Sequence, residues 1–230
     1  DAWELASERQ LNLNIVIGRD SQPSPPSPKG PSQVHVNSSR GEFTHFATTY
    51  EAIAKASSHE RKVELASNYL DSLDPSDIAT ACLFLSGRAF PRSSRKKLAI
   101  DPKLNRQAIL TATDATELDY KRSRATHVDS RSALLALVTR PDGSNRRLQD
   151  IRSLFTHLER APNPIYQHSL LSEQYKSMGP KETLALTLTA TGSGTGDIVE
   201  DVVEEALARR TRNSVDSVKR ANLRCSNLEK

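Results

Sequence analysis

Apolar residues recur every three or four positions over most of this chain, which is the spacing of one face of an α-helix. The pattern is clear from about Gly41 onward and predicts helices nearly throughout the remaining sequence. Three such faces are formed by Phe43, Phe46, Tyr50 and Ile53, by Val63, Ala66, Leu70 and Leu73, and by Leu154, Phe155 and Leu158. The body of the protein is therefore predicted to be all-α.

The first forty residues follow a different pattern. LNLNIVIG at residues 11–18 alternates with a period of two, which predicts a short strand. SQPSPPSPKGP at residues 21–31 holds five of the twelve prolines and cannot form regular hydrogen-bonded structure. We expect residues 1–40 to be a flexible extension and linker, followed by a helical domain at residues 41–230.

Helix starts are signalled by short polar residues and proline. Asp74-Pro75 and Asp101-Pro102 each place a capping aspartate before a proline at the first helical position. Residues 116–119 resemble a capping box, in which the side chains at both ends of the first turn bond to the backbone. These signals predict helices that begin at about residues 75, 102 and 117.

The helical part of the chain resembles itself when shifted by 105 positions. This offset aligns Pro75 with Pro180 and Gly87 with Gly192, and after the glycine an offset of 98 aligns the Lys-Arg pairs at residues 121–122 and 219–220. Apolar matches alone arise easily in helical sequence, but matched prolines, glycines and Lys-Arg pairs do not. The repeat predicts two lobes of one domain, at about residues 41–138 and 146–230.

The repeat aligns two connections between helices. SGRAFPRSSRKKLAIDPKL at residues 86–104 is strongly basic, whereas TATGSGTGDI at residues 189–198 consists of glycine and small side chains. Cations and backbone N–H groups both bind phosphate without reading base sequence. Two other interpretations remain open: a solvated face for the basic run, and a plain flexible turn for the glycines.

Known nucleotide-binding motifs are absent from the glycine-rich connection. No Gly-Lys-Ser/Thr follows GSGTG, and no βαβ unit surrounds it. RPDG at residues 140–143 places an arginine where nucleotidyltransferases need a lysine nucleophile, so an ordinary turn is favoured. The six histidines show no metal-ligand spacing, and His127 near Asp129 is best interpreted as a surface histidine or a hydrogen-bonded one.

Composition narrows the functional class only slightly. The chain has 230 residues, a net charge of +4 and 36% hydrophobic residues, which fits a nucleic-acid partner or simply a charged surface. Cys82 and Cys225 form no disulfide framework or metal spacing, and no apolar run is long enough to cross a bilayer. The chain begins at Asp1 rather than methionine, so we expect a fragment or a processed product.

Three segments, taken in their order along the chain, resemble the N-terminal, helical DNA-binding domain of ATP-dependent DNA ligases, especially bacterial and archaeal ones. They are ACLFLSGRAFP at residues 81–91, NPIYQHSLLSEQYKSMGPKE at residues 163–182, and VEEALARR at residues 203–210 followed by VKRAN at residues 218–222. The resemblance covers about residues 41–230 and implies two pseudo-repeated helical lobes. Where the family commonly has Leu-Arg-Ile-Gly, this chain has Gly194, Thr195, Gly196 and Asp197.

The resemblance implies a domain that lies along the minor groove of nicked duplex DNA and contacts sugar and phosphate on both sides of the break. Its implied partners are double-stranded nicked DNA and a ligase catalytic core, in cis or in trans, with no membrane. ATP and Mg belong to the full ligase, whereas these residues carry no nucleotidyltransferase motif and no cofactor of their own. The expected location is the nucleoid of a bacterial or archaeal cytoplasm, or the nucleus of a eukaryote.

We expect no catalytic or metal-binding residues in this chain. The candidate DNA-binding residues are basic or lie in the glycine-rich connection: Arg88, Arg92, Arg95, Lys96, Lys97, Lys121, Arg122, Ser193, Gly194, Thr195, Gly196, Lys219 and Arg220. The alternative from another class is a helical scaffold that recruits protein partners, which predicts a contiguous apolar groove and no basic face. A free-standing enzyme has no catalytic constellation to support it.

Overall fold

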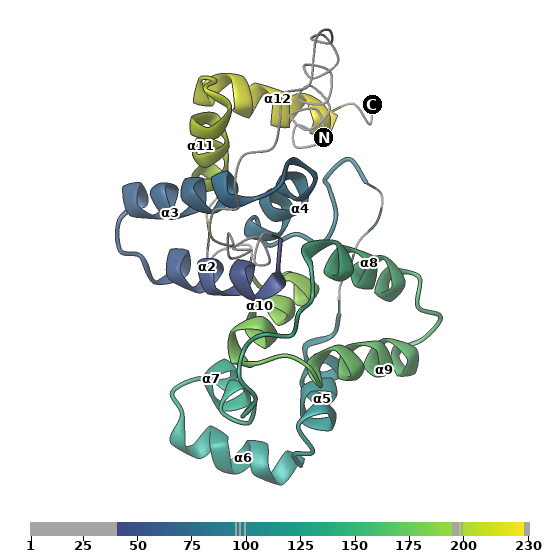
Figure 1. The fold of residues 1–230 in the computed structure, drawn as a ribbon. Helices are drawn as coiled ribbons and strands as arrows, with labels where there is room; N and C mark the ends of the chain where they lie inside the picture. Colours follow the sequence, from purple (N-terminus) through teal and green to yellow (C-terminus); the bar gives the residue numbers. More distant parts are fainter. Residues whose placement is uncertain are drawn as a thin grey trace, which may run out of the picture.

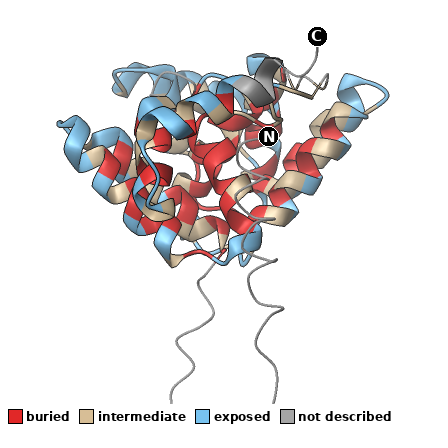
Figure 2. Ribbon diagram, turned by 90° about the horizontal axis from the view of Figure 1, so that it is seen from above, coloured by how far each residue is buried: buried red, intermediate tan, exposed pale blue. Residues whose placement is uncertain are grey.

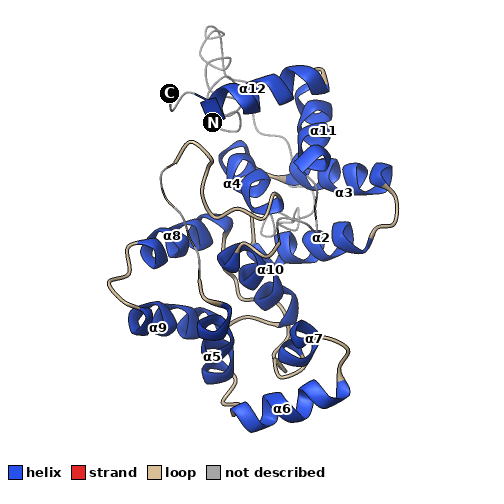
Figure 3. Ribbon diagram, turned by 180° about the vertical axis from the view of Figure 1, so that it is seen from behind, coloured by secondary structure: helices blue, strands red, loops and turns tan. Residues whose placement is uncertain are grey.

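The structure is a computed structural model that describes residues 41–94, 96, 98, 100–194, 198 and 200–227, with side chains described as far as residue 223. Within these residues the fold is entirely helical, which confirms the predicted all-α class, and Figure 3 shows helices joined by loops without a strand. The predicted strand at residues 11–18 lies outside the described residues. The helices, labelled as in Figure 1, are α2 (Phe43–Lys55), α3 (His59–Ser72), α4 (Pro75–Leu85), α5 (Pro102–Ala112), α6 (Glu117–Thr126), α7 (Ser130–Leu135), α8 (Leu148–Glu159), α9 (Pro164–Tyr175), α10 (Pro180–Thr191), α11 (Glu200–Thr211) and α12 (Val215–Asn227).

The helix starts follow the local sequence signals closely. Asp101 caps α5 by accepting hydrogen bonds from the backbone N–H groups of Lys103 and Leu104 at 2.7 and 3.1 Å. Thr116 and Asp119 form the predicted capping box of α6. Asp74 occupies the N-cap of α4, but its side chain makes no capping hydrogen bond there, so Pro75 at the first helical position provides the remaining start signal.

The core is built where α2, α4 and α8 meet. Phe46 of α2 stands edge-on to Phe84 of α4, with ring centroids 5.9 Å apart. Phe84 in turn packs edge-on against Phe155 of α8, at 5.3 Å. All three rings are fully buried, and Figure 2 shows buried residues on the inner sides of the helices and exposed residues outside. The apolar faces predicted from the sequence therefore point into one continuous core.

Helices pair mainly with partners that are distant in sequence. α3 packs against α11, α5 against α9, α2 against α10, and α4 against α8. Every one of these pairs joins a helix from the first half of the chain to a helix from the second half. The predicted lobe boundaries at residues 138 and 146 stay a prediction, and the structure adds that the two halves are packed closely together.

Two backbone hydrogen bonds join the starts of α2 and α8. The N–H of Phe43 donates to the carbonyl of Arg146 at 2.6 Å, and the N–H of Leu148 donates to the carbonyl of Gly41 at 3.0 Å. Between them, Glu42 and Arg147 form an antiparallel bridge. Under the offset of 105, Glu42 faces its own counterpart Arg147. The same offset converts one hydrogen bond into the other, because it aligns Phe43 with Leu148 and Gly41 with Arg146. This is the geometry of a local two-fold axis, and it supports the repeat hypothesis.

The glycines that the repeat aligns have the same backbone conformation. Gly87 follows α4 and Gly192 ends α10, and each has a φ of +68°. This left-handed conformation is favourable for glycine and strained for most other residues. Both helices therefore end in the same kind of turn, and each turn leads into one of the two aligned connections.

The RPDG segment, for which the sequence predicts an ordinary surface turn, contacts three helices in the structure. Asp142 caps α10 by accepting a hydrogen bond from the backbone N–H of Lys181 at 2.9 Å. Arg140 donates to the carbonyl oxygens of Lys176 and Ala112, which lie at the ends of α9 and α5. The turn thus fixes the start of α10 relative to the ends of two other helices.

Glu182 is a fully buried carboxylate that connects three parts of the fold. It accepts hydrogen bonds from the hydroxyl of Thr44 at 2.6 Å and from both the hydroxyl and the N–H of Ser144 at 2.7 and 3.1 Å. The backbone N–H groups of Gly143 and Gly179 also donate to it. Burial alone would raise the pKa of Glu182, but these hydrogen bonds lower the pKa overall, so the group stays ionised at neutral pH.

Replacement of Glu182 by alanine is expected to destabilise the protein by about 3–5 kcal/mol, because several buried donors lose their acceptor at once. Urea unfolding followed by circular dichroism measures this loss. Glu173→Ala is the matched control, since Glu173 is exposed and its ion pair in the described residues is with the exposed Lys176. This substitution should change the free energy of unfolding by less than about 0.5 kcal/mol. Equal effects of the two substitutions would contradict the role given to Glu182.

Candidate nucleic-acid interface

The basic connection between α4 and α5 lies against the start of α11. Arg88 and Arg92 both donate from Nη2 to the same oxygen, Oε2 of Glu200, at 3.0 and 2.9 Å. Further along the connection, the backbone N–H of Ile100 donates to the carbonyl of Ala190 at 3.4 Å. The two connections that the repeat aligns therefore come together in space, although about a hundred residues separate them in sequence.

Lys96 also belongs to this basic connection. Its ammonium lies 5.8 Å from the centroid of the Phe90 ring, within the range of a cation–π interaction. Arg95 and Lys97 lie outside the described residues. The described part of the connection thus presents three of the predicted cations, with Arg88 half-buried and Arg92 exposed.

The glycine-rich connection uses its described backbone internally. The N–H of Gly194 donates to the carbonyl of Leu188 at 3.2 Å, and the carbonyl of Gly194 accepts from the hydroxyl of Tyr50 at 3.3 Å. A Cβ atom at Gly194 would lie 2.8 Å from that hydroxyl, so a larger residue at this position would require the Tyr50 side chain to shift. Ser193 is exposed, whereas Thr195 and Gly196 lie outside the described residues.

The two Lys-Arg pairs lie far from each other. Lys121 and Arg122 are on α6, whereas Lys219 and Arg220 are on α12, and Figure 1 places these helices at opposite ends of the molecule. Nη1 of Arg122 lies 3.6 Å from Oδ1 of Asp119, one turn earlier in α6. Nζ of Lys219 lies 3.2 Å from Oδ1 of Asp201 in α11, with which it forms an ion pair. The structure therefore does not bring the two pairs into one patch.

Glu200 and Asn222 complete the arginine cluster, and no pattern in the sequence identifies either residue as part of it. The amide of Asn222 on α12 donates to Oε1 of Glu200 at 2.9 Å, on the opposite side from the two arginines. Burial alone would raise the pKa of Glu200, but the hydrogen bonds from Asn222 and Arg88 and the charges of both arginines lower the pKa overall. An acid in a first helical turn is so common that only the tertiary contact identifies this one.

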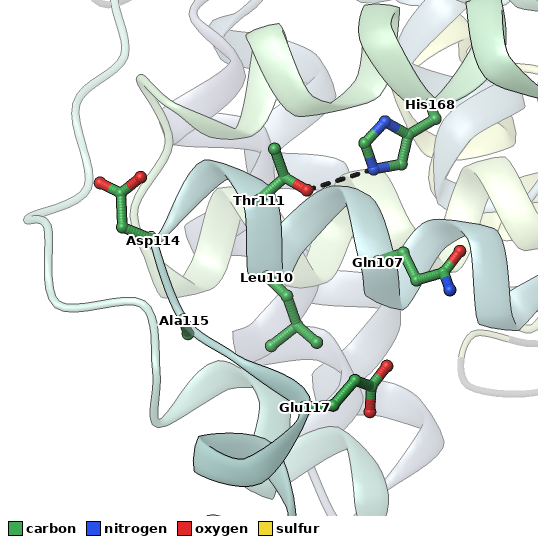
Figure 4. A pocket seen from close by; sticks show the side chains of 7 residues that line it. All are labelled: Gln107, Leu110, Thr111, Asp114, Ala115, Glu117 and His168. Atoms are coloured by element: carbon green, nitrogen blue, oxygen red, sulfur yellow. Dashed lines mark hydrogen bonds between the residues drawn. The ribbon is translucent and has the colours of Figure 1, made fainter.

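The structure offers little support for a small-molecule or metal site in the described residues. An open hollow of about 480 Å³ lies between α5, α6 and α9, and Figure 4 shows Asp114 and Glu117 on opposite sides of it. The one hydrogen bond drawn there joins Thr111 to His168 at 3.2 Å. No group of three metal-ligating side chains occurs in the described part of the chain, and His127 is bonded to the backbone of Ser123.

Cys82 is buried, and burial raises the pKa of its thiol, which makes it a poor nucleophile. None of the helices within the described ranges combines the length and the apolar character needed to cross a bilayer.

Comparison with known proteins decides the family. Residues 42–208 match the model of the family described as DNA ligase N terminus. The chain belongs to this family. The match confirms the resemblance to the N-terminal domain of ATP-dependent DNA ligases that the three sequence segments indicated.

Relatives of this DNA ligase N-terminal chain occur in bacteria and archaea. A probable DNA ligase of Opitutus terrae is 24% identical over 99% of this chain and 27% of its own length. A probable DNA ligase of Koribacter versatilis is 26% identical over 77% of the chain and 31% of its own length. A DNA ligase of Methanopyrus kandleri is 24% identical over 81% of the chain and 35% of its own length. The chain thus spans about a quarter to a third of these relatives.

Stability is expected to fall on acidification below about pH 5, because the pKa values of Glu182 and Glu200 are lower in the folded state than in the unfolded chain. The contribution of these two groups to the free energy of unfolding is fully present above their pKa in the unfolded chain, and it is lost as pH falls through their pKa in the folded state. Urea unfolding at stepwise pH measures the effect. The loss between pH 6 and pH 3.5 should be smaller in Glu200→Gln than in the unmodified protein, and coincident profiles would contradict the assignment.

Proposed function

We propose that residues 41–230 form the DNA-binding domain of an ATP-dependent DNA ligase. In this proposal the domain holds nicked duplex DNA by its sugar–phosphate backbone along the minor groove and supports strand sealing in DNA replication, repair and recombination. The observation that carries the proposal is a cluster of cations on the α4–α5 connection in a chain that belongs to the DNA ligase N-terminal family. Cations on a connection between helices bind phosphate without selecting base sequence.

The catalytic part of the reaction is assigned to other residues of the ligase. The chain spans only 27–35% of the length of its relatives, which leaves room in such proteins for a catalytic core that uses ATP and Mg. DNA binding by this domain would position the nick for that core. The corresponding location is wherever the DNA lies, which is the cytoplasmic nucleoid in a bacterium or archaeon.

A protein-recruiting scaffold is the weaker alternative. Large exposed apolar side chains are few in the described residues, and they are spread over α6, the turn that follows it, α9 and α12: Leu118, Val128, Ile165, Tyr166 and Leu223. α6 and α12 lie at opposite ends of the molecule (Figure 1), so these side chains do not form one groove. A single contiguous apolar patch is the usual mark of a docking surface.

Binding to nicked duplex should weaken steeply with salt. Three phosphate contacts correspond to a loss of about 40-fold in affinity between 50 and 200 mM monovalent salt, because binding releases counterions from the DNA. Fluorescence anisotropy with nicked duplex, intact duplex and single strand of equal length measures this dependence. Both duplexes should bind more tightly than the single strand. An affinity that does not change with salt would contradict phosphate-mediated binding.

Charge reversal on the basic connection should reduce duplex affinity by about 100-fold and lower the salt slope, because three contacts are lost. The variant is Arg92→Glu/Arg95→Glu/Lys96→Glu. Its control, Lys55→Glu/Arg61→Glu/Lys62→Glu, changes net charge equally at the end of α2 and the start of α3, across the molecule in Figure 1. Equal losses in both variants would show that net charge, and not this connection, governs binding. Thermal unfolding of each variant verifies folding.

A further inference from the structure

Arg88 and Arg92 converge on one carboxylate oxygen from the same connection. Their Nη2 atoms lie 3.0 and 2.9 Å from Oε2 of Glu200, which begins α11 more than a hundred residues later. Without the carboxylate between them, two guanidinium groups at this separation would repel each other. Glu200 is therefore the group that allows the two arginine side chains to lie side by side.

The carboxylate of Glu200 is itself held in a fixed orientation. The amide of Asn222 donates to Oε1 of Glu200 and also to Oε1 of Glu204, each at 2.9 Å. Asn222 is 8% exposed, so α12 supports the carboxylate from the protein interior. One oxygen of Glu200 is thus anchored on α12, and the other oxygen faces the two arginines.

The contacts within the described residues leave most of the hydrogen-bonding capacity of the two arginines unused. A guanidinium has five N–H donors, and each arginine uses one terminal nitrogen on Glu200. The cluster of two arginines and one glutamate keeps a net charge of +1. The Arg92 side chain is 48% exposed and that of Arg88 is 20% exposed, so unused donors reach the surface. Planar guanidinium groups match the geometry of phosphate oxygens.

We propose that Glu200 is a positioning residue for DNA binding, which holds Arg88 and Arg92 together so that both contact one backbone phosphate. This inference rests on the proposed function. A free arginine side chain loses rotamer freedom when it binds, and a side chain that is already oriented loses less. The acidic residue therefore strengthens the binding of an anion, which is opposite to the effect expected from its charge alone.

The substitution Glu200→Gln separates positioning from simple repulsion. It removes a negative charge, so repulsion alone predicts tighter binding to nicked duplex. Positioning predicts binding that is weaker by about fivefold or more at 100 mM salt, because two arginine side chains become free to move. Glu205→Gln is the matched control: it removes the same charge from the same helix, where Glu205 pairs with His59 of α3 at 3.0 Å. The control should bind as tightly as the unmodified chain or slightly more tightly.

A double-mutant cycle distinguishes positioning from a structural role. In an Arg88→Ala/Arg92→Ala background, Glu200→Gln should have no further effect on DNA affinity, since no arginine remains to be positioned. A loss of affinity that persists in this background would overturn the inference. If Glu200→Gln does not fold, Asn222→Ala provides the second test, because it loosens Glu200 without changing net charge and should also weaken binding.

The outcomes also separate this inference from the proposed function. If the unmodified chain shows no salt-dependent binding to duplex DNA, the proposed function fails. If it binds as expected but Glu200→Gln binds equally well or more tightly, only the positioning role of Glu200 is wrong. The anisotropy assay with nicked duplex gives both results in one series.

Discussion

The starts of α2 and α8 are joined by two backbone hydrogen bonds, between Phe43 and Arg146 and between Leu148 and Gly41. Beyond this junction, Phe46 of α2 and Phe155 of α8 both pack edge-on against Phe84 of α4. The positions of α2 and α8 in turn determine where two further helices pack: α10 lies against α2, and α4 lies against α8. The rest of the fold depends on this antiparallel contact, at whose centre Glu42 faces Arg147, its counterpart under the offset of 105.

Glu182 extends the same junction to α10. Its carboxylate receives hydrogen bonds from Thr44 near the start of α2, from Ser144 before α8, and from Gly179 before α10. Asp77, which the repeat aligns with Glu182, accepts a hydrogen bond from Gln149 of α8 at 2.9 Å. Buried carboxylates that accept several hydrogen bonds are costly to remove. The starts of α2 and α8 are therefore held by charge-assisted hydrogen bonds to Glu182 and Asp77 as well as by apolar packing.

The proposed DNA-binding surface depends on these junctions indirectly. Because α3 packs against α11, the first turn of α11 comes beside the connection that follows α4. Glu200 then meets Arg88 and Arg92, and Asn222 of α12 supports the carboxylate from behind. The arrangement of cations on the α4–α5 connection is therefore a property of the packed domain, and the connection alone does not determine it.

The sequence by itself determined the helical class, the apolar faces and the capping signals, because these depend on residues within one or two turns of each other. The face of Phe43, Phe46, Tyr50 and Ile53 is buried as predicted, and the capping residues Asp101 and Thr116 act as predicted. The prediction from local sequence is incomplete at Asp74, which occupies the predicted N-cap position but whose side chain makes no capping hydrogen bond. Only the tertiary structure decided that α3 pairs with α11 and that Glu200 meets two arginines. Such contacts depend on how whole helices pack, and neither periodicity nor local charge specifies which distant helix supplies the partner.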